Sequence, residues 1–141
     1  RIIRTEDVRG QLVLRAAVEC QAARLCCGGP VKNNMKELHE LAEIADKPRT
    51  DPVKNWENEY PFHRAFVTLT DCKELLAAFD RIMSRSLFYS IHYLLKTDTT
   101  SMRMAHAELL TLMKSSSQDR AETAMRKHIE SGYEKVFSRD L

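Results

Sequence analysis

Apolar residues recur at helical spacing along almost the whole 141-residue chain, and no strand-like alternation lasts long enough to predict a sheet. Polar and helix-breaking residues divide this pattern into six segments. The expected helices cover about residues 5–27, 31–45, 52–69, 72–96 and 101–114, with a sixth from the SSSQD turn to about residue 136. Because the connections are short, the sequence predicts one all-α domain, an antiparallel helical bundle.

Particular residues mark the ends of these helices. Thr5 is followed by two acidic residues, and acidic side chains in a first turn favour the positive end of the helix dipole. Gly28-Gly29-Pro30 ends the first helix. Asp51-Pro52 begins the third, because it places a capping residue before a proline at the first helical position.

Four ionisable residues stand where the helices would otherwise carry core hydrophobics. Glu59 and His63 are four residues apart in WENEYPFHRAF, so they would project from one face of a helix. His106 and His128 each interrupt the apolar stripe of a later helix. Burying such groups is unfavourable unless they are paired or coordinated. Three imidazole nitrogens and one carboxylate oxygen are typical ligands of a first-row metal ion.

Simpler interpretations remain open at this point. A glutamate and a histidine four residues apart on a helix are more often a surface ion pair. A single histidine on an apolar stripe is more often a core residue whose nitrogens are hydrogen-bonded. Metal binding is favoured by the presence of such positions on three different helices, because a bundle brings their inward faces together.

Three passages resemble the C-terminal ligand-binding domain of GntR-type bacterial transcription regulators, the FadR C-terminal or FCD domain. RAAVECQAARLCC, residues 15–27, is similar to the opening helix of that family. EYPFHRAF, residues 59–66, resembles its D-x-x-F-H motif. AHAELLTLMKSSSQDRAETAMRKHI, residues 105–129, resembles its closing pair of helices. The resemblance spans essentially the whole chain and implies a bundle of six or seven helices.

The resemblance also implies a metal centre. His63, His106 and His128 take the places of the family's three metal-binding histidines, and Glu59 takes that of its aspartate. The extra methylene of Glu59 would move its carboxylate outward, so it would bind in a shifted geometry or through water. Such ligands suit zinc, nickel, cobalt or manganese, and we expect zinc.

The resemblance further implies that the open metal positions receive a small carboxylate effector, an organic acid. A carboxylate needs a counter-charge, and the candidates are Arg15, Arg81 and Arg85. Arg15 shares a helix face with Glu19, so an ion pair between these two is an equal alternative. For Arg81 and Arg85 the alternative is a solvated surface position.

The implied role is that of an effector-sensing, homodimeric domain of a cytoplasmic transcription regulator, not an enzyme. The chain begins with Arg1, and we expect a winged helix-turn-helix upstream that alone binds DNA. The net charge is +2 and no strongly basic face or tail stands out, so the charge balance gives no reason to expect nucleic-acid binding by this part. No apolar run approaches the roughly 20 residues that a membrane span requires, so no membrane partner is expected.

Two other functions compete with this one. Three histidines with open metal positions could activate water in a metal-dependent hydrolase or oxygenase. However, no HD or HExxH pattern and no paired E-x-x-H elements accompany them. The other candidate is a metal-free dimerisation module with histidines at polar core positions. The four cysteines have no CxxC spacing, and we expect reduced thiols packed as small apolar residues.

Overall fold

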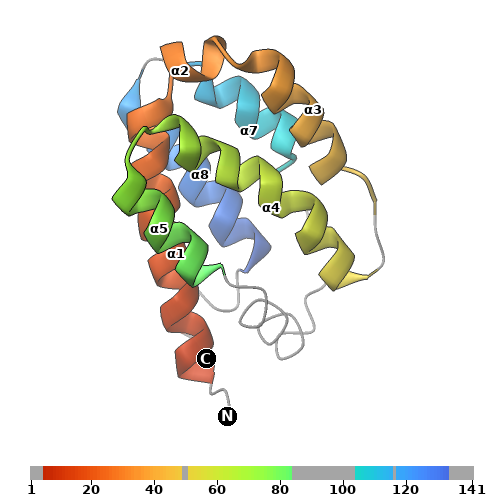
Figure 1. Ribbon diagram of the computed structural model, residues 1–141. Helices are drawn as coiled ribbons and strands as arrows, with labels where there is room; N and C mark the ends of the chain where they lie inside the picture. The colour runs from red at the N-terminus through yellow and green to blue at the C-terminus, as the bar shows by residue number, and fades with distance from the viewer. Residues whose placement is uncertain (1–4, 49–50, 84–103, 116, 134–141) are drawn as a thin grey trace.

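The computed structural model describes residues 5–48, 51–83, 104–115 and 117–133, and these residues form helices and turns with no strand (Figure 1). Seven helices lie in this part of the chain: α1 (Thr5–Cys26), α2 (Gly29–Lys32), α3 (Met35–Ala45), α4 (Pro52–Leu69), α5 (Lys73–Ile82), α7 (His106–Met113) and α8 (Gln118–Gly132). The all-α fold predicted from the sequence is confirmed. None of the described helices is long and apolar enough to cross a membrane.

The single helix expected over residues 31–45 is wrong, since two helices, α2 and α3, occupy this region. The break lies at Asn33 and Asn34. The Asn34 side-chain amide donates a hydrogen bond to the Pro30 carbonyl oxygen at 2.8 Å. Such side-chain bonds to the backbone compete with helix continuation. The Asn34 carbonyl then accepts from the Leu38 amide at 3.0 Å and begins α3.

Other helix ends follow the sequence signals more closely. Gly28 has φ 78° and ψ −120°, a positive-φ conformation that is open mainly to glycine, and it follows α1 as predicted. α4 begins at Pro52 and ends before Asp71, which has φ 57°. α7 begins later than expected, at His106, because Ala105 is extended with ψ 150°. The expected extensions of α5 to residue 96 and of α8 to residue 136 lie outside the described residues.

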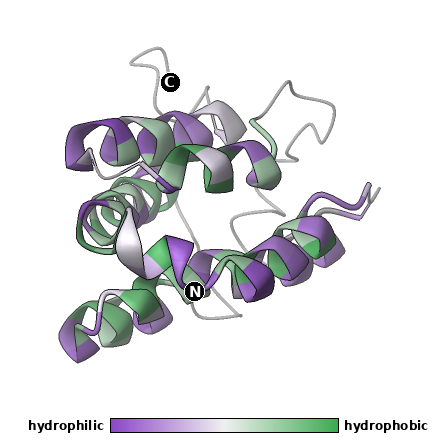
Figure 2. Cartoon of the chain, turned by 90° about the horizontal axis from the view of Figure 1, so that it is seen from above, coloured by the Kyte–Doolittle hydropathy of each residue, from purple (hydrophilic) through white to green (hydrophobic). Residues whose placement is uncertain are grey.

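α4 runs across the front of the bundle in the view of Figure 1 and packs against α1, α3 and α5. α1 lies along α8, α4 and α5, while α3 covers α4 and α7. Hydrophobic and hydrophilic residues occupy different sides of these helices (Figure 2). One buried apolar cluster joins α1, α2, α3, α4, α7 and α8, and a second joins α1, α4 and α5. Phe62 and Phe66 of α4 belong to the first cluster, and Trp56 and Val67 to the second. α4 therefore contributes to both.

Candidate metal centre

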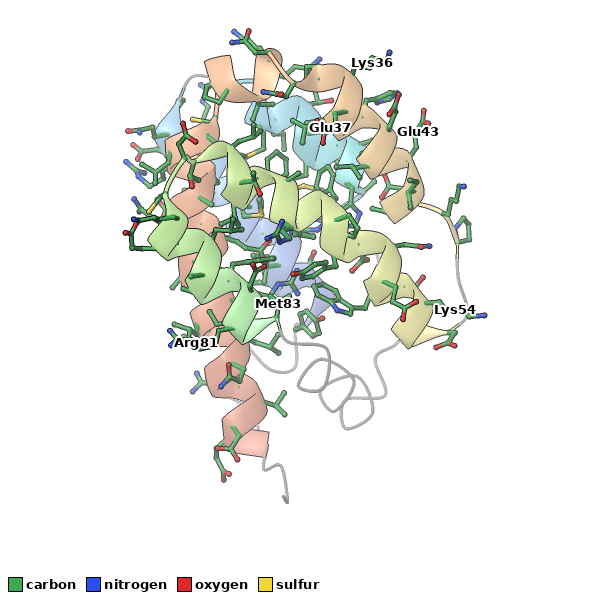
Figure 3. All side chains as sticks on the ribbon, viewed as in Figure 1. Lys36, Glu37, Glu43, Lys54, Arg81 and Met83 are labelled. Atoms are coloured by element: carbon green, nitrogen blue, oxygen red, sulfur yellow. The ribbon has the colours of Figure 1, made fainter. Side chains whose placement is uncertain are left out.

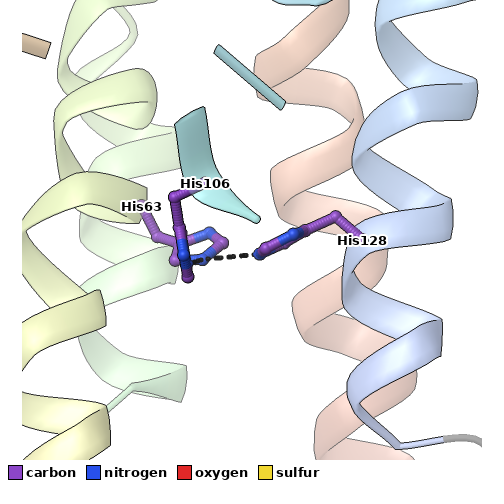
Figure 4. Close-up of side chains that lie close together, drawn as sticks. All are labelled: His63, His106 and His128. Atoms are coloured by element: carbon purple, nitrogen blue, oxygen red, sulfur yellow. Dashed lines mark hydrogen bonds between the residues drawn. The ribbon is translucent and has the colours of Figure 1, made fainter. Parts of the chain in front are cut away.

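Three histidine side chains from three helices meet inside the bundle (Figure 4). His63 comes from the middle of α4, His106 is the first residue of α7, and His128 lies in the second half of α8. All three are buried, with at most 2% of each residue exposed. The Nε2 atom of His63 lies 3.3 Å from Nε2 of His106 and 3.3 Å from Nε2 of His128. The sequence prediction that these three residues lie together is consistent with this geometry.

The other ring nitrogen of each histidine faces a hydrogen-bond acceptor. Nδ1 of His63 lies 2.5 Å from a carboxylate oxygen of Glu19, and Nδ1 of His106 lies 2.9 Å from one of Asp46. Nδ1 of His128 lies 2.9 Å from the carbonyl oxygen of Met104. These acceptors place the proton of a neutral imidazole on Nδ1. Each Nε2 atom is then left as a lone-pair donor directed at the other two.

Burial supports the neutral form of the central ring. The buried environment lowers the pKa of His63, and this effect outweighs the attraction of the Glu19 carboxylate. The charge of Arg15 lowers the pKa further. A neutral His63 with its proton on Nδ1 has no proton to donate from Nε2 toward His106 or His128.

The spacing of the three nitrogens fits a metal ion. Zn–N bonds are about 2.0–2.1 Å long, and tetrahedral angles place two such nitrogens about 3.3 Å apart. The two measured Nε2–Nε2 distances are both 3.3 Å, longer than the roughly 2.9–3.0 Å of an ordinary N–H hydrogen bond. Facing lone pairs at this distance repel each other unless a cation lies between them. His63, His106 and His128 are therefore the described residues that could hold a metal.

Glu59 is buried one helical turn before His63, as predicted, with 5% of the residue exposed. The ligand atoms of the three histidines lie within 4.8 Å of one another, and the Glu59 carboxylate is not part of that group. It lies instead within electrostatic range of Arg15 and helps to raise the pKa of that guanidinium. Direct ligation by Glu59 stays a prediction.

Arg15 is connected to the histidine cluster through Glu19, which contacts both Arg15 and His63. Its Nε atom donates to the second carboxylate oxygen of Glu19 at 2.6 Å, and Arg15 is only 4% exposed. The guanidinium carbon lies 5.3 Å from the ring centroid of Trp56 and 5.9 Å from that of Tyr133, within cation–π range. The ion pair between Arg15 and Glu19 is thus present, and it is buried. Burial lowers the pKa of Arg15, but Glu19, Tyr133 and Glu59 together raise it above its ordinary value.

The two other predicted arginines are not part of this arrangement. Arg81 is exposed near the end of α5 (Figure 3), which matches the solvated alternative. Arg85 lies outside the described residues. Among the described candidates for a counter-charge, Arg15 alone is close to the histidines.

A family model for the FCD domain matches residues 11–131, which is most of the chain. The chain belongs to the FCD family. This domain is the FadR C-terminal domain of GntR-family regulators, an all-α regulatory domain that binds small-molecule effectors. No curated protein and no solved structure gave a match. The resemblance drawn from the three sequence passages is confirmed.

Two residues of this FCD domain that contact the site were not predicted from the sequence. The sequence indicates Glu19 only as a possible partner of Arg15, although it lies on the same buried face of α1 as Leu12. Asp46 has no periodicity signal, because it follows the last residue of α3. An indirect signal existed in Ala105, which precedes α7 and has no side chain able to cap that helix.

Proposed function

We propose that this FCD domain is the effector-sensing part of a GntR-type transcription regulator and that it binds one divalent metal ion, zinc. The proposed ligands are His63, His106 and His128. The observation that carries the proposal is the convergence of three Nε2 atoms while each Nδ1 atom faces an acceptor. An arrangement of only hydrogen-bond acceptors in a buried site is unfavourable without a cation.

The proposed effector is a small organic acid. Three neutral imidazole ligands compensate none of the double positive charge of the ion, and a Glu59 carboxylate would compensate only half of it, so an anionic additional ligand is favoured. Arg15 is the best-supported counter-charge, because it is buried and adjacent to Glu19, the partner of His63. Glu59 is the proposed fourth protein ligand, and Arg81 and Arg85 are retained only as predictions from the sequence.

The three proposed ligands come from α4, α7 and α8. An effector that binds the metal would therefore favour one arrangement of these helices over others. A ligand shifts an equilibrium between two states by the difference in its affinity for them. We propose that this shift is passed to a DNA-binding domain outside this chain, in a homodimer.

The test is thermal unfolding with and without zinc, followed by a panel of small mono-, di- and tricarboxylates added to the zinc-loaded protein. At a free zinc concentration 100 times the Kd, binding stabilises the native state by about 2.7 kcal/mol. We expect a clear rise in melting temperature for the wild type and none for His128→Ala. The matched control is His39→Ala, because His39 is exposed on α3 and its Nε2 atom lies 3.2 Å from the exposed carboxylate of Glu43.

A further rise with one class of carboxylate, seen only when zinc is bound, would support the effector proposal. Equal zinc stabilisation of His128→Ala and wild type would contradict the metal site. Carboxylate stabilisation without metal would contradict the role of the ion in effector binding.

A further inference from the structure

Two carboxylates contact the sides of the histidine rings that face away from the cluster. Glu19 of α1 reaches Nδ1 of His63, and Asp46, just after α3, reaches Nδ1 of His106. Neither is in the group of converging ligand atoms. Both are far from their histidines in the sequence, so these contacts are produced by the packing of α1 on α4 and of α3 on α7.

Each carboxylate is itself fixed by further hydrogen bonds. The second oxygen of Glu19 accepts from Arg15 at 2.6 Å. Asp46 accepts from the backbone amide of His106 at 2.8 Å and, through its other oxygen, from that of Ala107 at 2.9 Å. These two amides belong to the first turn of α7, where backbone N–H groups have no partner within the helix. Asp46 therefore caps α7 from another helix and binds His106 with the same carboxylate.

We propose that Glu19 and Asp46 are positioning residues for the metal ion, which extends the proposed function and rests on it. Each carboxylate holds the proton of its histidine on Nδ1 and turns the Nε2 lone pair toward the other two rings. A carboxylate behind a metal-binding histidine also makes the ligating nitrogen more basic. Their negative charges also favour a cation at the cluster, Asp46 more than Glu19, because the Glu19 charge is paired with that of Arg15.

The contacts of Asp46 add a mechanical consequence. Because one carboxylate binds both the His106 ring and the start of α7, fixing the ring on a metal ion also fixes the first turn of α7 against the end of α3. If the contacts of Asp46 make the metal bind more tightly, then metal binding strengthens these contacts by the same factor. Metal binding should therefore slow hydrogen exchange at the amides of His106 and Ala107, and this slowing should be weaker in Asp46→Asn.

The main experiment measures zinc affinity of the whole chain by competition with a chromophoric chelator. The variants are Glu19→Gln and Asp46→Asn, and the control is Glu43→Gln. Glu43 is a suitable control because it also contacts a histidine, His39, but both side chains are more than half exposed. Removing such a carboxylate typically weakens metal binding by about 10–100-fold. We expect that loss for the first two variants and a change below about twofold for the control.

A second readout does not require metal. The ¹⁵N shifts of the imidazoles in the metal-free protein report which nitrogen carries the proton. We expect the Nδ1–H form for His63 and His106 in the wild type and a mixture of forms for His106 in Asp46→Asn. Asparagine is a good helix-capping residue, so this variant should fold. If Glu19→Gln does not fold, Asp46→Asn alone tests the positioning role.

The outcomes separate this inference from the metal site itself. If Glu19→Gln and Asp46→Asn bind zinc as tightly as Glu43→Gln, while His106→Ala loses it, the positioning role is wrong and the metal site stands. If His106→Ala also binds zinc with wild-type affinity, the proposed function fails. A wild-type His106 that carries its proton on Nε2 would likewise overturn the positioning role.

Discussion

Replacing Glu19 by glutamine should destabilise the metal-free protein, because it removes the carboxylate to which the buried Arg15 guanidinium donates a hydrogen bond. Burial alone would raise the pKa of Glu19, but the charges and hydrogen bonds of His63 and Arg15 lower it from 4.5 to about 2. A difference of this size corresponds to about 3 kcal/mol of stability at neutral pH. That figure is an upper bound, because the largest contribution to the lowering comes from a charged His63, and burial favours the neutral ring. We therefore expect a loss of about 2–3 kcal/mol.

The pH dependence has a defined sign. Because the folded-state pKa of Glu19 is depressed, its contribution is fully present above the unfolded value of 4.5 and is lost as pH falls toward about 2. Glutamine does not titrate. The difference in stability between wild type and Glu19→Gln should therefore be largest at neutral pH and should shrink below about pH 4.5.

Urea unfolding followed by circular dichroism measures this difference at pH 7, 5, 4 and 3 in the presence of a chelator. In thermal unfolding of a domain of this size, the same loss of 2–3 kcal/mol lowers the melting temperature by about 10 °C. Glu43→Gln is the control, because exposed ion pairs contribute only about 0–1 kcal/mol. A Glu19→Gln loss no larger than that of the control, or one that is unchanged between pH 7 and pH 3, would refute the reasoning.

The remaining predictions concern the core. Phe62→Ala should cost about 3–5 kcal/mol in urea unfolding, because Phe62 is fully buried with its ring centroid 5.0 Å from that of His106; a loss below 1.5 kcal/mol would contradict this. Burial raises the pKa of Cys20 to about 11 and that of Cys26 to about 12, so both thiols stay protonated at pH 8. Peptide mass spectrometry after native alkylation should find label on Cys27 and Cys72, which are partly exposed, and rapid native labelling of Cys26 would show the packing to be wrong.

The sequence predicted the parts of this structure that depend on local pattern. The helical periodicity identified α1, α4 and α8, and the end signals at Gly28-Gly29-Pro30 and Asp51-Pro52 placed the end of α1 and the start of α4. It also placed His106 and His128 on buried faces, where the structure has them. The asparagine pair before α3 was not recognised as a break, because asparagine is only mildly unfavourable in a helix and its bond to Pro30 is visible only in three dimensions.

The contacts around the histidines could not be predicted in the same way. Glu19 and His63 are 44 residues apart, and Asp46 and His106 are 60 residues apart. No local rule pairs residues at such separations, since the pairing depends on how helices cross. The spacing of Glu59 from His63 placed Glu59 on a buried face, but the direction of its side chain relative to Arg15 depends on the packing of α1.

The most direct test of the metal centre is the zinc content of the protein, measured by elemental analysis after purification without a metal-affinity column, for wild type and His106→Ala. The geometry predicts close to one zinc per wild-type chain and almost none in the variant. Circular dichroism should show that both proteins are folded. Equal zinc in the two proteins, or no zinc in a wild type that also fails to take it up on addition, would contradict the assignment of His63, His106 and His128 as ligands.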